Sequence, residues 1–350
     1  MSVQRRGLIV GKFWPPHNGH QRAFDLLRAS SDHLTIVVCG DPSQVPAVFD
    51  RAMWIQSANP DAEVVTVSDL CAWHHPHDCP PECTALWVDR LGELGLSEFD
   101  VVVASETYGK PFADALGAEL IDSARDSDGL SATAIRDDLR GRWLDLPPVV
   151  RAGLHRRVVV LGAESTGTTT LSLDLERQLS MPVAPEAGRT LSWRLMAAAG
   201  DMGNIRWAES HFWEVVNLQI GLEHQAVFSR IDDCPGELGP WLVCDTDTLA
   251  TVAWWERYLN VVQSGIPKLA SIRLGDLYLV TSPHDVEFDH ADPLRDGRQV
   301  RSAMHDRFIE LVEESGRPWV LLSGNPEERL AGAIEAMTTF EQTHPRWVHL

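Results

Sequence analysis

The stretch that decides the fold of the first half of the chain is Leu8-Ile-Val10-Gly11-Lys-Phe-Trp-Pro-Pro-His17-Asn-Gly-His20. It joins a short apolar run, typical of a buried strand, to a glycine-bounded loop and then to residues with helical spacing. Strand, loop and helix in this order are typical of a parallel α/β sheet. Ligands of such sheets bind where strands end and helices begin. The stretch therefore predicts both a fold class and the place of a first site.

Further apolar, β-branched runs alternate with helical spacing along the whole chain. The runs are 8–10, 34–39, 64–67 and 101–104, followed by 158–161, 241–244, 277–280 and 319–322. This alternation predicts an α/β protein with two doubly wound parallel-sheet domains, a Rossmann-like domain followed by a P-loop domain.

The proline pair in Asp145-Leu-Pro-Pro148 lies between the two series of strands, and proline pairs end helices and mark connections. We therefore predict a first domain over residues 1–146, a linker over 147–155 and a second domain over 156–350.

Composition and charge exclude several classes of partner. The 350 residues are 44% hydrophobic, which is ordinary for a globular protein. The formal charge of −20 and the lack of a Lys/Arg run disfavour nucleic acid as a main partner. No apolar stretch approaches the ~18 residues of a membrane span, and the N-terminus has no signal-peptide pattern. Six cysteines do not form a disulfide scaffold, so we expect a cytoplasmic protein without a membrane partner.

Two histidines three residues apart at the start of a predicted helix suit a phosphate site. The glycines allow the backbone to approach a ligand, and the helix start adds its positive dipole end. His17 and His20 can donate hydrogen bonds to a phosphoryl group in its transition state, and Gly11, Lys12 and Phe13 are predicted to line the same site. The alternative is that the histidines only begin the helix. The full ten-residue pattern favours the phosphate site.

This stretch resembles the G-x-F-x-P-x-H-x-G-H signature of the nucleotidyltransferase superfamily, whose members join a nucleoside triphosphate to a phosphate group and release pyrophosphate. Leu130-Ser131-Ala132-Thr133-Ala-Ile-Arg136 resembles the superfamily's I-S-S-T-x-I-R motif, with alanine in place of the second serine. The resemblance implies that Ser131 and Thr133 hold triphosphate oxygens and that Arg136 neutralises the transition state. By itself the second motif is also typical of a helix cap.

A third stretch, Ser105-Glu-Thr-Tyr108-Gly109, resembles the S-x-x-Y-G turn of the branch that adenylylates nicotinamide mononucleotide (NMN). Arg51 and Trp54 stand where that branch has an R-x-x-W-I helix near the NMN site. The resemblance implies substrate contacts for Arg51, Trp54, Tyr108 and Gly109. A buried tryptophan and a solvated arginine are the open alternative.

Three cysteines and three histidines gather within residues 71–83. Thiolates and imidazoles are zinc ligands. The candidate ligands are Cys71, His74, His77, Cys79 and Cys83. Their spacing does not match a C-x-x-C pair and prolines interrupt it, so an irregular surface loop is favoured over structural Zn²⁺.

The second half contains a strand, a glycine-bounded loop and a helix, in which the loop is Gly162-Ala-Glu-Ser-Thr166-Gly167-Thr168-Thr169-Thr170. The spacing matches G-x-x-x-x-G-K-[ST], a P-loop whose backbone N–H groups bind phosphates. Thr168 replaces the lysine, which removes a charge that stabilises the β- and γ-phosphates. Thr169 remains as a candidate Mg²⁺ ligand.

Two carboxylates follow the strand 241–244. Alternate residues of an extended chain point the same way, so we expect Asp245 and Asp247 to face one ligand as a Mg²⁺-handling or hydroxyl-activating pair. Capping of the strand end is the alternative. Arg295, Arg298 and Arg301 share one face of a predicted helix, where they could close over a triphosphate as a lid and replace the missing lysine's charge. A solvated arginine triplet is the alternative here.

The order of the two halves resembles the bifunctional NMN adenylyltransferase / ribosylnicotinamide kinase family across nearly the whole chain. The likeness extends to Leu146-Pro-Pro-x-x-Arg151, Pro185-Glu186-Ala-Gly-Arg189, Cys244-Asp-Thr-Asp247 with Thr251, Asp276-Leu-Tyr-Leu279 and Leu322-Ser-Gly324. It implies a kinase that converts nicotinamide riboside and ATP to NMN, and an adenylyltransferase that converts NMN and ATP to NAD and pyrophosphate, both with Mg²⁺. It also implies that Glu186 and Arg189 lie near the riboside, and that Asp245 and Asp247 act as general base and Mg²⁺ partner in an order left open.

Other interpretations remain open from the sequence. Thr168 favours a one-site adenylyltransferase whose P-loop half senses a nucleotide without turning it over. An adenylyltransferase for another phosphate, such as phosphopantetheine, is disfavoured by the P-loop half and by Tyr108-Gly109. Some members of the family carry an N-terminal helix-turn-helix; because the first signature begins at residue 11, we expect none here. A homo-oligomer is compatible with the sequence.

Overall fold

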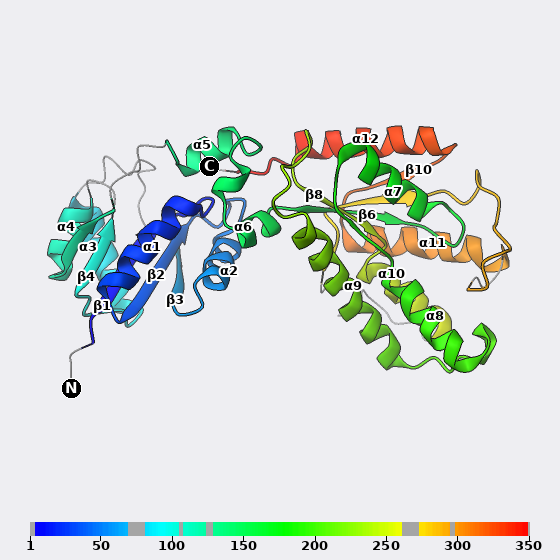
Figure 1. The fold of residues 1–350 in the computed structure, drawn as a ribbon, viewed down its shortest axis with the longest axis horizontal. Helices are drawn as coiled ribbons and strands as arrows, with labels where there is room; N and C mark the ends of the chain where they lie inside the picture. Colours follow the sequence, from blue (N-terminus) through cyan, green and yellow to red (C-terminus); the bar gives the residue numbers. More distant parts are fainter. Residues whose placement is uncertain are drawn as a thin grey trace. The chain divides into compact units, whose positions relative to one another are not determined.

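The computed structural model describes residues 4–68, 81–104, 108–123, 129–260, 273–294 and 298–348. The chain divides into two compact units (Figure 1). The first unit comprises Met1–Gly153 together with Pro345–Leu350, and the second comprises Leu154–His344. This division differs from the predicted boundaries in two ways. Helix α6 (Pro148–Gly153) occupies much of the predicted linker, and the C-terminal segment groups with the first unit.

The first unit is built on a five-stranded parallel sheet with the order β3-β2-β1-β4-β5. Its strands are β1 (Arg6–Gly11), β2 (His33–Gly40), β3 (Glu63–Ser68), β4 (Val101–Ala104) and β5 (Glu119–Asp122). Its other helices are α1 (Asn18–Ser30), α2 (Val48–Ala58), α3 (Pro81–Glu93), α4 (Gly109–Leu116) and α5 (Ala132–Asp137). From the central strand β1 the chain adds β2 and β3 toward one edge of the sheet, and it then adds β4 and β5 toward the other edge. The strand order therefore reverses between β1 and β4, and ligands of such sheets bind at the carboxyl ends of these two strands.

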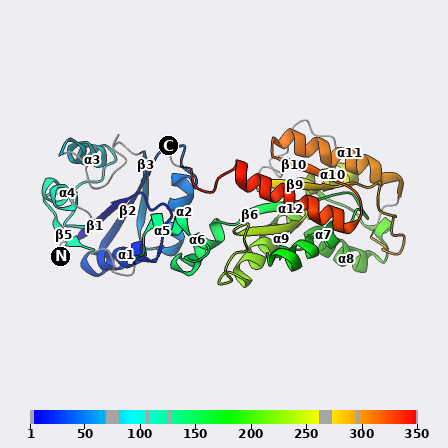
Figure 2. The same ribbon diagram turned by 90° about the horizontal axis from the view of Figure 1, so that it is seen from above.

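Period-two alternation in the strands separates two cores in the first unit. Ile9 of β1 packs with Phe24 of α1 and Ile55 of α2 on one face of the sheet. Leu8, its neighbour in β1, packs on the other face with Leu91 of α3 and with α4. Both faces are therefore covered by helices, as Figure 2 shows from above, and the strands read as continuous apolar runs.

The second unit contains a second five-stranded parallel sheet with the order β10-β9-β6-β8-β7. Its strands are β6 (Arg156–Leu161), β7 (Val183–Ala184), β8 (Trp241–Asp245), β9 (Leu277–Thr281) and β10 (Trp319–Leu322). Its helices are α7 (Thr168–Leu179), α8 (Ala187–Ala199), α9 (Glu209–Ser229), α10 (Thr248–Leu259), α11 (Arg298–Ser315) and α12 (Pro326–Thr343). Val160 pairs with Asp245, so the register of β6 and β8 brings this carboxylate beside the start of the P-loop.

The predicted fold class is confirmed, and each of the eight predicted apolar runs lies in a strand. β5 and β7 are not among the predicted strands. β5 is half-exposed at an edge of its sheet, and β7 has only two residues, so neither leaves a clear apolar run. No helix in the described part of the chain is long and apolar enough to cross a membrane.

A buried ion-pair cluster joins β6 to α9 in the second unit. Glu223 of α9 is fully buried; its Oε1 lies 2.7 Å from Nη2 of Arg157, and its Oε2 lies 3.0 Å from Nε of Arg273. Removing one partner of a buried ion pair is costly, because the remaining charge stays out of water without compensation.

We expect Glu223→Gln to lower the free energy of unfolding of the second unit by about 3 kcal/mol, because two guanidinium groups lose their shared carboxylate. Urea-induced unfolding followed by circular dichroism measures this loss. Glu93→Gln, which removes the exposed ion pair with Arg90 in α3, is the matched control and should cost less than about 1 kcal/mol. Equal effects of the two substitutions would contradict the assignment.

Candidate nucleotide sites

The first candidate site lies where β1 passes into α1. His17 caps α1, with its Nδ1 accepting a hydrogen bond from the backbone N–H of Gly19 at 3.1 Å. Nδ1 of His20 accepts from the backbone N–H of His17 at 3.2 Å, and the two rings stack at 3.6 Å between centroids. An accepting Nδ1 is unprotonated, so each neutral ring carries its proton on Nε2. The N–H donor of each ring is therefore at Nε2.

The charge state of His20 agrees with this donor role. Burial lowers the pKa of His20 well below its ordinary value, and the neighbouring His17 lowers it further. The ring is therefore neutral at physiological pH, and it can donate from Nε2 without carrying a charge.

The residues before His17 hold the loop in shape. A Cβ at Gly11 would lie 2.8 Å from the Phe13 ring, so only glycine fits there. Phe13 is buried with φ 45°, and its ring meets the His20 ring edge-on at 5.0 Å between centroids. Lys12 is half-buried in the same loop.

The second signature packs directly on the first. Arg136 donates to the carbonyl oxygen of Trp14 at 2.6 Å and to Oγ1 of Thr133 at 3.1 Å. Its guanidinium also lies 4.2 Å from the centroid of the Trp14 ring, a cation–π contact. Ser131 caps α5 by accepting from the N–H of Ala134 at 3.1 Å. The fold therefore brings together two motifs more than a hundred residues apart.

Arg51, predicted to contact the mononucleotide, is instead fully buried. Its guanidinium donates to Oε1 of Gln44 at 3.0 Å and to the carbonyl oxygens of Lys12 and Cys39. Burial lowers the pKa of Arg51 to about 10, which leaves it a cation at neutral pH. Its observed contacts hold the first signature loop from the inside.

The other residues predicted to contact NMN also make internal contacts. The indole of Trp54 packs so closely on Gly153 of α6 that a Cβ at this glycine would collide with it. The hydroxyl of Tyr108 donates to the carbonyl oxygen of Val10 at 3.2 Å. A Cβ at Gly109 would lie 2.7 Å from the Cβ of Ala104, the last residue of β4. This close contact fixes the start of α4. Residues 105–107 of the predicted turn lie outside the described residues.

The sequence analysis missed one contributor to the first site, the C-terminal segment. Val348 forms an antiparallel bridge with Val45, and each backbone N–H donates to the other's carbonyl oxygen at 3.3 Å. The Trp347 ring meets the Trp14 ring at 6.3 Å between centroids and 89°. Trp14 therefore contacts both Arg136 and the C-terminal segment.

Most of the predicted zinc candidates cannot be placed, since Cys71, His74, His77 and Cys79 lie outside the described residues. Cys83 is buried in α3. No group of three or more His, Cys, Asp or Glu side chains suited to a metal ion occurs within the described ranges. The preference for an irregular surface loop over a zinc site therefore stays a prediction.

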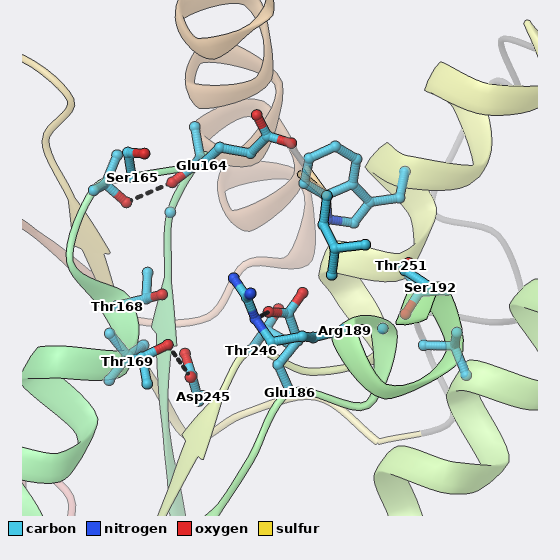
Figure 3. Close-up of a pocket in the computed structure, with 18 of the residues that line it drawn as sticks. Glu164, Ser165, Thr168, Thr169, Glu186, Arg189, Ser192, Asp245, Thr246 and Thr251 are labelled. Carbon is cyan, nitrogen blue, oxygen red and sulfur yellow. Dashed lines mark hydrogen bonds and ion pairs between the residues drawn. The ribbon is translucent and has the colours of Figure 1, made fainter. Parts of the chain in front are cut away.

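The second candidate site is a cavity of about 240 Å³ at the carboxyl ends of β6 and β8. The P-loop, residues 162–170, forms one wall, and Glu186 and Arg189 of the α8 region face it (Figure 3). Gly167 caps α7 with φ 83°, a backbone conformation that favours glycine. A Cβ at Gly162 would collide with the Thr281 and Thr166 hydroxyls.

A carboxylate and a hydroxyl meet at the P-loop side of this cavity. The Thr169 hydroxyl donates to Oδ2 of Asp245 at 2.6 Å (Figure 3). Burial raises the pKa of Asp245, while hydrogen bonds from Thr169 and Thr168 oppose the shift. Carboxylate and hydroxyl oxygens are the protein ligands that Mg²⁺ prefers, so the pair fits the predicted ion.

The expectation that Asp245 and Asp247 face one ligand is not met. β8 ends at Asp245, and Thr246 has φ 70°, so the alternation of an extended strand stops between the two carboxylates. Asp247 is buried as the N-cap of α10, where it accepts from the N–H of Leu249 at 2.9 Å and from the Tyr278 hydroxyl at 2.6 Å. Asp245 lines the cavity, and Asp247 fixes α10 to β9.

An acidic group with a strongly shifted pKa lies across the cavity. Glu186 precedes α8, and Arg189 lies in the first turn of that helix, with Nε 3.7 Å from Oε2 of Glu186 and Nη1 2.8 Å from Oδ2 of Asp292. Burial, together with the nearby carboxylate of Asp245, raises the pKa of Glu186 to about 7. Glu186 therefore exchanges its proton near neutral pH.

The three arginines predicted to form a lid have different environments. Arg295 lies outside the described residues, and Arg298 is exposed at the start of α11. Arg301 is buried, and its guanidinium donates to the carbonyl oxygens of Ser165 at 2.8 Å and Val286 at 2.9 Å. Arg301 is thus bound to the P-loop backbone rather than closed over the cavity.

An aromatic wall, which the sequence analysis did not identify, completes the cavity. Trp207 and Tyr258 stack at 4.4 Å between centroids with 13° between their planes, and Trp254 stacks on Tyr258 at 5.9 Å. Phe212 lies 5.7 Å from Trp207. Flat aromatic faces suit a planar heterocycle. The abundance of tryptophan was the only sequence signal for this wall.

Comparisons with known proteins agree with this organisation. A family model described as an AAA domain matches residues 157–329. The trifunctional NAD biosynthesis/regulator protein NadR of Salmonella typhimurium is 25% identical over 337 residues, which cover 90% of this chain and 78% of that protein. The protein of the same name from Escherichia coli K12 is 26% identical over 205 residues, covering 52% of this chain and 48% of the relative.

Solved structures share the fold of both units. A NadR protein crystallised in complex with NR gives a TM-score of 0.67 at 21% identity, covering 100% of this chain and 99% of that one. A NadR structure in complex with NAD and AMP-PNP gives a TM-score of 0.63 at 20% identity, covering 99% and 98%.

Glu186 makes the stability of the second unit depend on pH. The folded chain keeps a proton up to about pH 7 that the unfolded chain releases near its ordinary pKa of 4.5. This stabilising contribution is fully present below pH 4.5 and is lost as pH rises through about 7. When the melting temperature is measured at several pH values in this window, it should change less with pH in Glu186→Gln than in wild type. The exposed Glu209→Gln serves as the control, and an unchanged slope in Glu186→Gln would contradict the assignment.

Proposed function

We propose, from the similarity of this chain to NadR proteins of NAD biosynthesis, that it catalyses two successive reactions. The second unit phosphorylates nicotinamide riboside with ATP to give NMN and ADP. The first unit transfers the adenylyl group of ATP to NMN, giving NAD and pyrophosphate. The observation that carries the proposal is the second cavity, where a P-loop, the Thr169–Asp245 pair and an aromatic wall face one another.

In the proposed adenylyl transfer, a phosphate oxygen of NMN attacks the α-phosphorus of ATP, and the bond to the bridging oxygen of pyrophosphate breaks. Charge builds up on the non-bridging oxygens of the α-phosphate. His17 and His20 would donate Nε2–H to these oxygens without reorganising, because the backbone hydrogen bonds to their Nδ1 atoms fix the tautomer. Arg136, oriented by Trp14 and Thr133, would add a positive charge on the same side.

In the proposed kinase reaction, backbone N–H groups of residues 162–170 bind the ATP phosphates. The pyridinium ring of the riboside stacks on the aromatic wall. Glu186 accepts the proton of the attacking riboside hydroxyl, since its pKa of about 7 suits a general base at neutral pH. Thr169 and Asp245 would hold Mg²⁺, which supplies charge neutralisation on the phosphates.

A second candidate function rests on Thr168, which stands at the P-loop position of the lysine. In this alternative the first unit is an adenylyltransferase and the second unit binds a nucleotide without phosphorylating a substrate. The cavity carboxylates Asp245 and Glu186 favour the kinase over this alternative, because nucleotide sensing does not require a proton acceptor.

Substitutions in the two sites should separate the two reactions. With ATP, Mg²⁺ and riboside, we expect wild type to form ADP, NMN, pyrophosphate and NAD. Asp245→Asn should stop product formation from riboside and retain NAD formation from added NMN. His20→Ala should do the reverse, lowering adenylyl transfer by about 10²-fold while NMN accumulates from riboside.

Chromatography of all four products from one reaction makes the measurement, and each variant is the other's folding control. Formation of NAD by wild type from NMN but not from riboside would instead support the nucleotide-sensing alternative. Absence of NAD from either substrate would contradict the adenylyl transfer that both candidate functions assign to the first unit.

A further inference from the structure

Two buried guanidinium groups contact the backbone of the P-loop that lacks a lysine. Arg301 of α11 and Arg329 of α12 are only 7% and 3% exposed. Arg301 donates to the carbonyl oxygen of Ser165, and Arg329 donates through Nη1 to that of Thr166. Consecutive carbonyls of the loop are therefore held by two cations from different helices.

The contacts of Arg329 fix its position tightly. Its Nη2 donates to the carbonyl oxygen of Ser282 at 3.0 Å, and its Nε donates to that of Gly324 at 2.8 Å. Asp285, whose side chain is 39% exposed, lies 3.9 Å away and balances part of the charge. Arg329 thus bridges the P-loop, the end of β9 and the end of β10 through three carbonyl groups.

The bond to Thr166 also sets the direction of a neighbouring N–H group. In a trans peptide the C=O and the following N–H point in opposite directions. With the carbonyl of Thr166 turned toward Arg329, the N–H of Gly167 points away from Arg329, and Gly167 lines the cavity. A Cβ at Gly167 would lie 3.7 Å from Nη1 of Arg329, so the charge is immediately behind the loop.

The described ionisable side chains that line the cavity are mostly acidic. Glu164, Glu186 and Asp245 line it, against Arg189, which is already paired with Asp292. A triphosphate needs positive potential in a site where the usual lysine is Thr168. Arginine keeps its charge when buried, and a low-dielectric surrounding screens that charge less than water does.

We propose that Arg329, assisted by Arg301, replaces the P-loop lysine as the source of positive charge for a bound nucleoside triphosphate, and acts through the loop that it orients. Arg329 is a positioning residue, separated from the ligand by the loop. This inference rests on the proposed ATP site of the second unit. It applies because Thr168 stands where a P-loop ordinarily has its lysine.

The test combines Arg329→Gln and Arg329→Lys with Thr168→Lys. Affinity is measured by titrating ATP with Mg²⁺ and following hydrogen–deuterium exchange in the peptide that contains residues 162–170. This readout is local to the second site and needs no turnover. We expect Arg329→Gln to weaken ATP binding about tenfold, the order expected for a buried charge that acts on the phosphates across the loop. Arg329→Lys should retain most of the affinity.

Adding Thr168→Lys to Arg329→Gln distinguishes a role of Arg329 as a source of charge from a role in holding the fold. It should restore most of the ATP affinity of Arg329→Gln, because a lysine supplies the charge directly. If Arg329 serves only to hold the fold, Arg329→Gln lowers the melting temperature and Thr168→Lys does not restore ATP binding. Unchanged affinity in Arg329→Gln, or failure of the rescue, overturns the inference. Arg177→Gln, which removes an exposed arginine of α7, the helix that begins at Thr168, is the matched control.

The inference and the proposed kinase fail in different ways. If ATP protects the 162–170 peptide from exchange but no ADP forms from riboside, the kinase proposal is contradicted. The effect of Arg329 on ATP affinity can still be measured in that case. ADP formation with an unchanged KM for ATP in Arg329→Gln contradicts the inference alone. A wild-type chain whose P-loop peptide gains no protection from ATP overturns both.

Discussion

In both units, buried guanidinium groups hold the carbonyl oxygens of the loop that follows the central strand. Arg51 does this at Lys12 in the first unit, and Arg301 and Arg329 do so at Ser165 and Thr166 in the second. A loop that offers N–H groups to a phosphate must satisfy its carbonyl groups elsewhere, because buried backbone oxygens without partners are costly. Arginine suits this role, since its planar group can serve several carbonyls and keeps its charge.

Under the proposed function, this arrangement accounts for the binding of anionic ligands by an acidic chain. The net charge of −20 belongs to the whole chain, whereas a phosphate responds to the few groups near it. In the first unit these are two neutral imidazoles with fixed Nε2–H donors and the Arg136 guanidinium. In the second unit they are the P-loop backbone and the cations behind it. In both proposed sites, local dipoles and buried cations take the place of a basic surface.

The order of strands determines which functional side chains meet. β6 and β8 are neighbours in the sheet although the residues between them include α7, α8 and α9, and their register places Asp245 beside the P-loop. The aromatic wall forms from Trp207 before α9, from Phe212 in α9 and from α10, which packs against α9. The C-terminal segment similarly reaches Trp14 after the whole second unit has intervened in the sequence.

The sequence by itself determined the fold class, the eight principal strands, the P-loop and the pairing of both nucleotidyltransferase motifs with one domain. These features are local: apolar periodicity and glycine spacing are written within ten or twenty residues. Only the tertiary structure decided the environments of Arg51, Asp247 and Arg301, whose side chains are buried against backbone or capping groups rather than directed at a ligand. A motif gives the identity of a side chain, but its direction depends on where a strand stops, as the positive φ of Thr246 shows, and on which distant helix packs beside it.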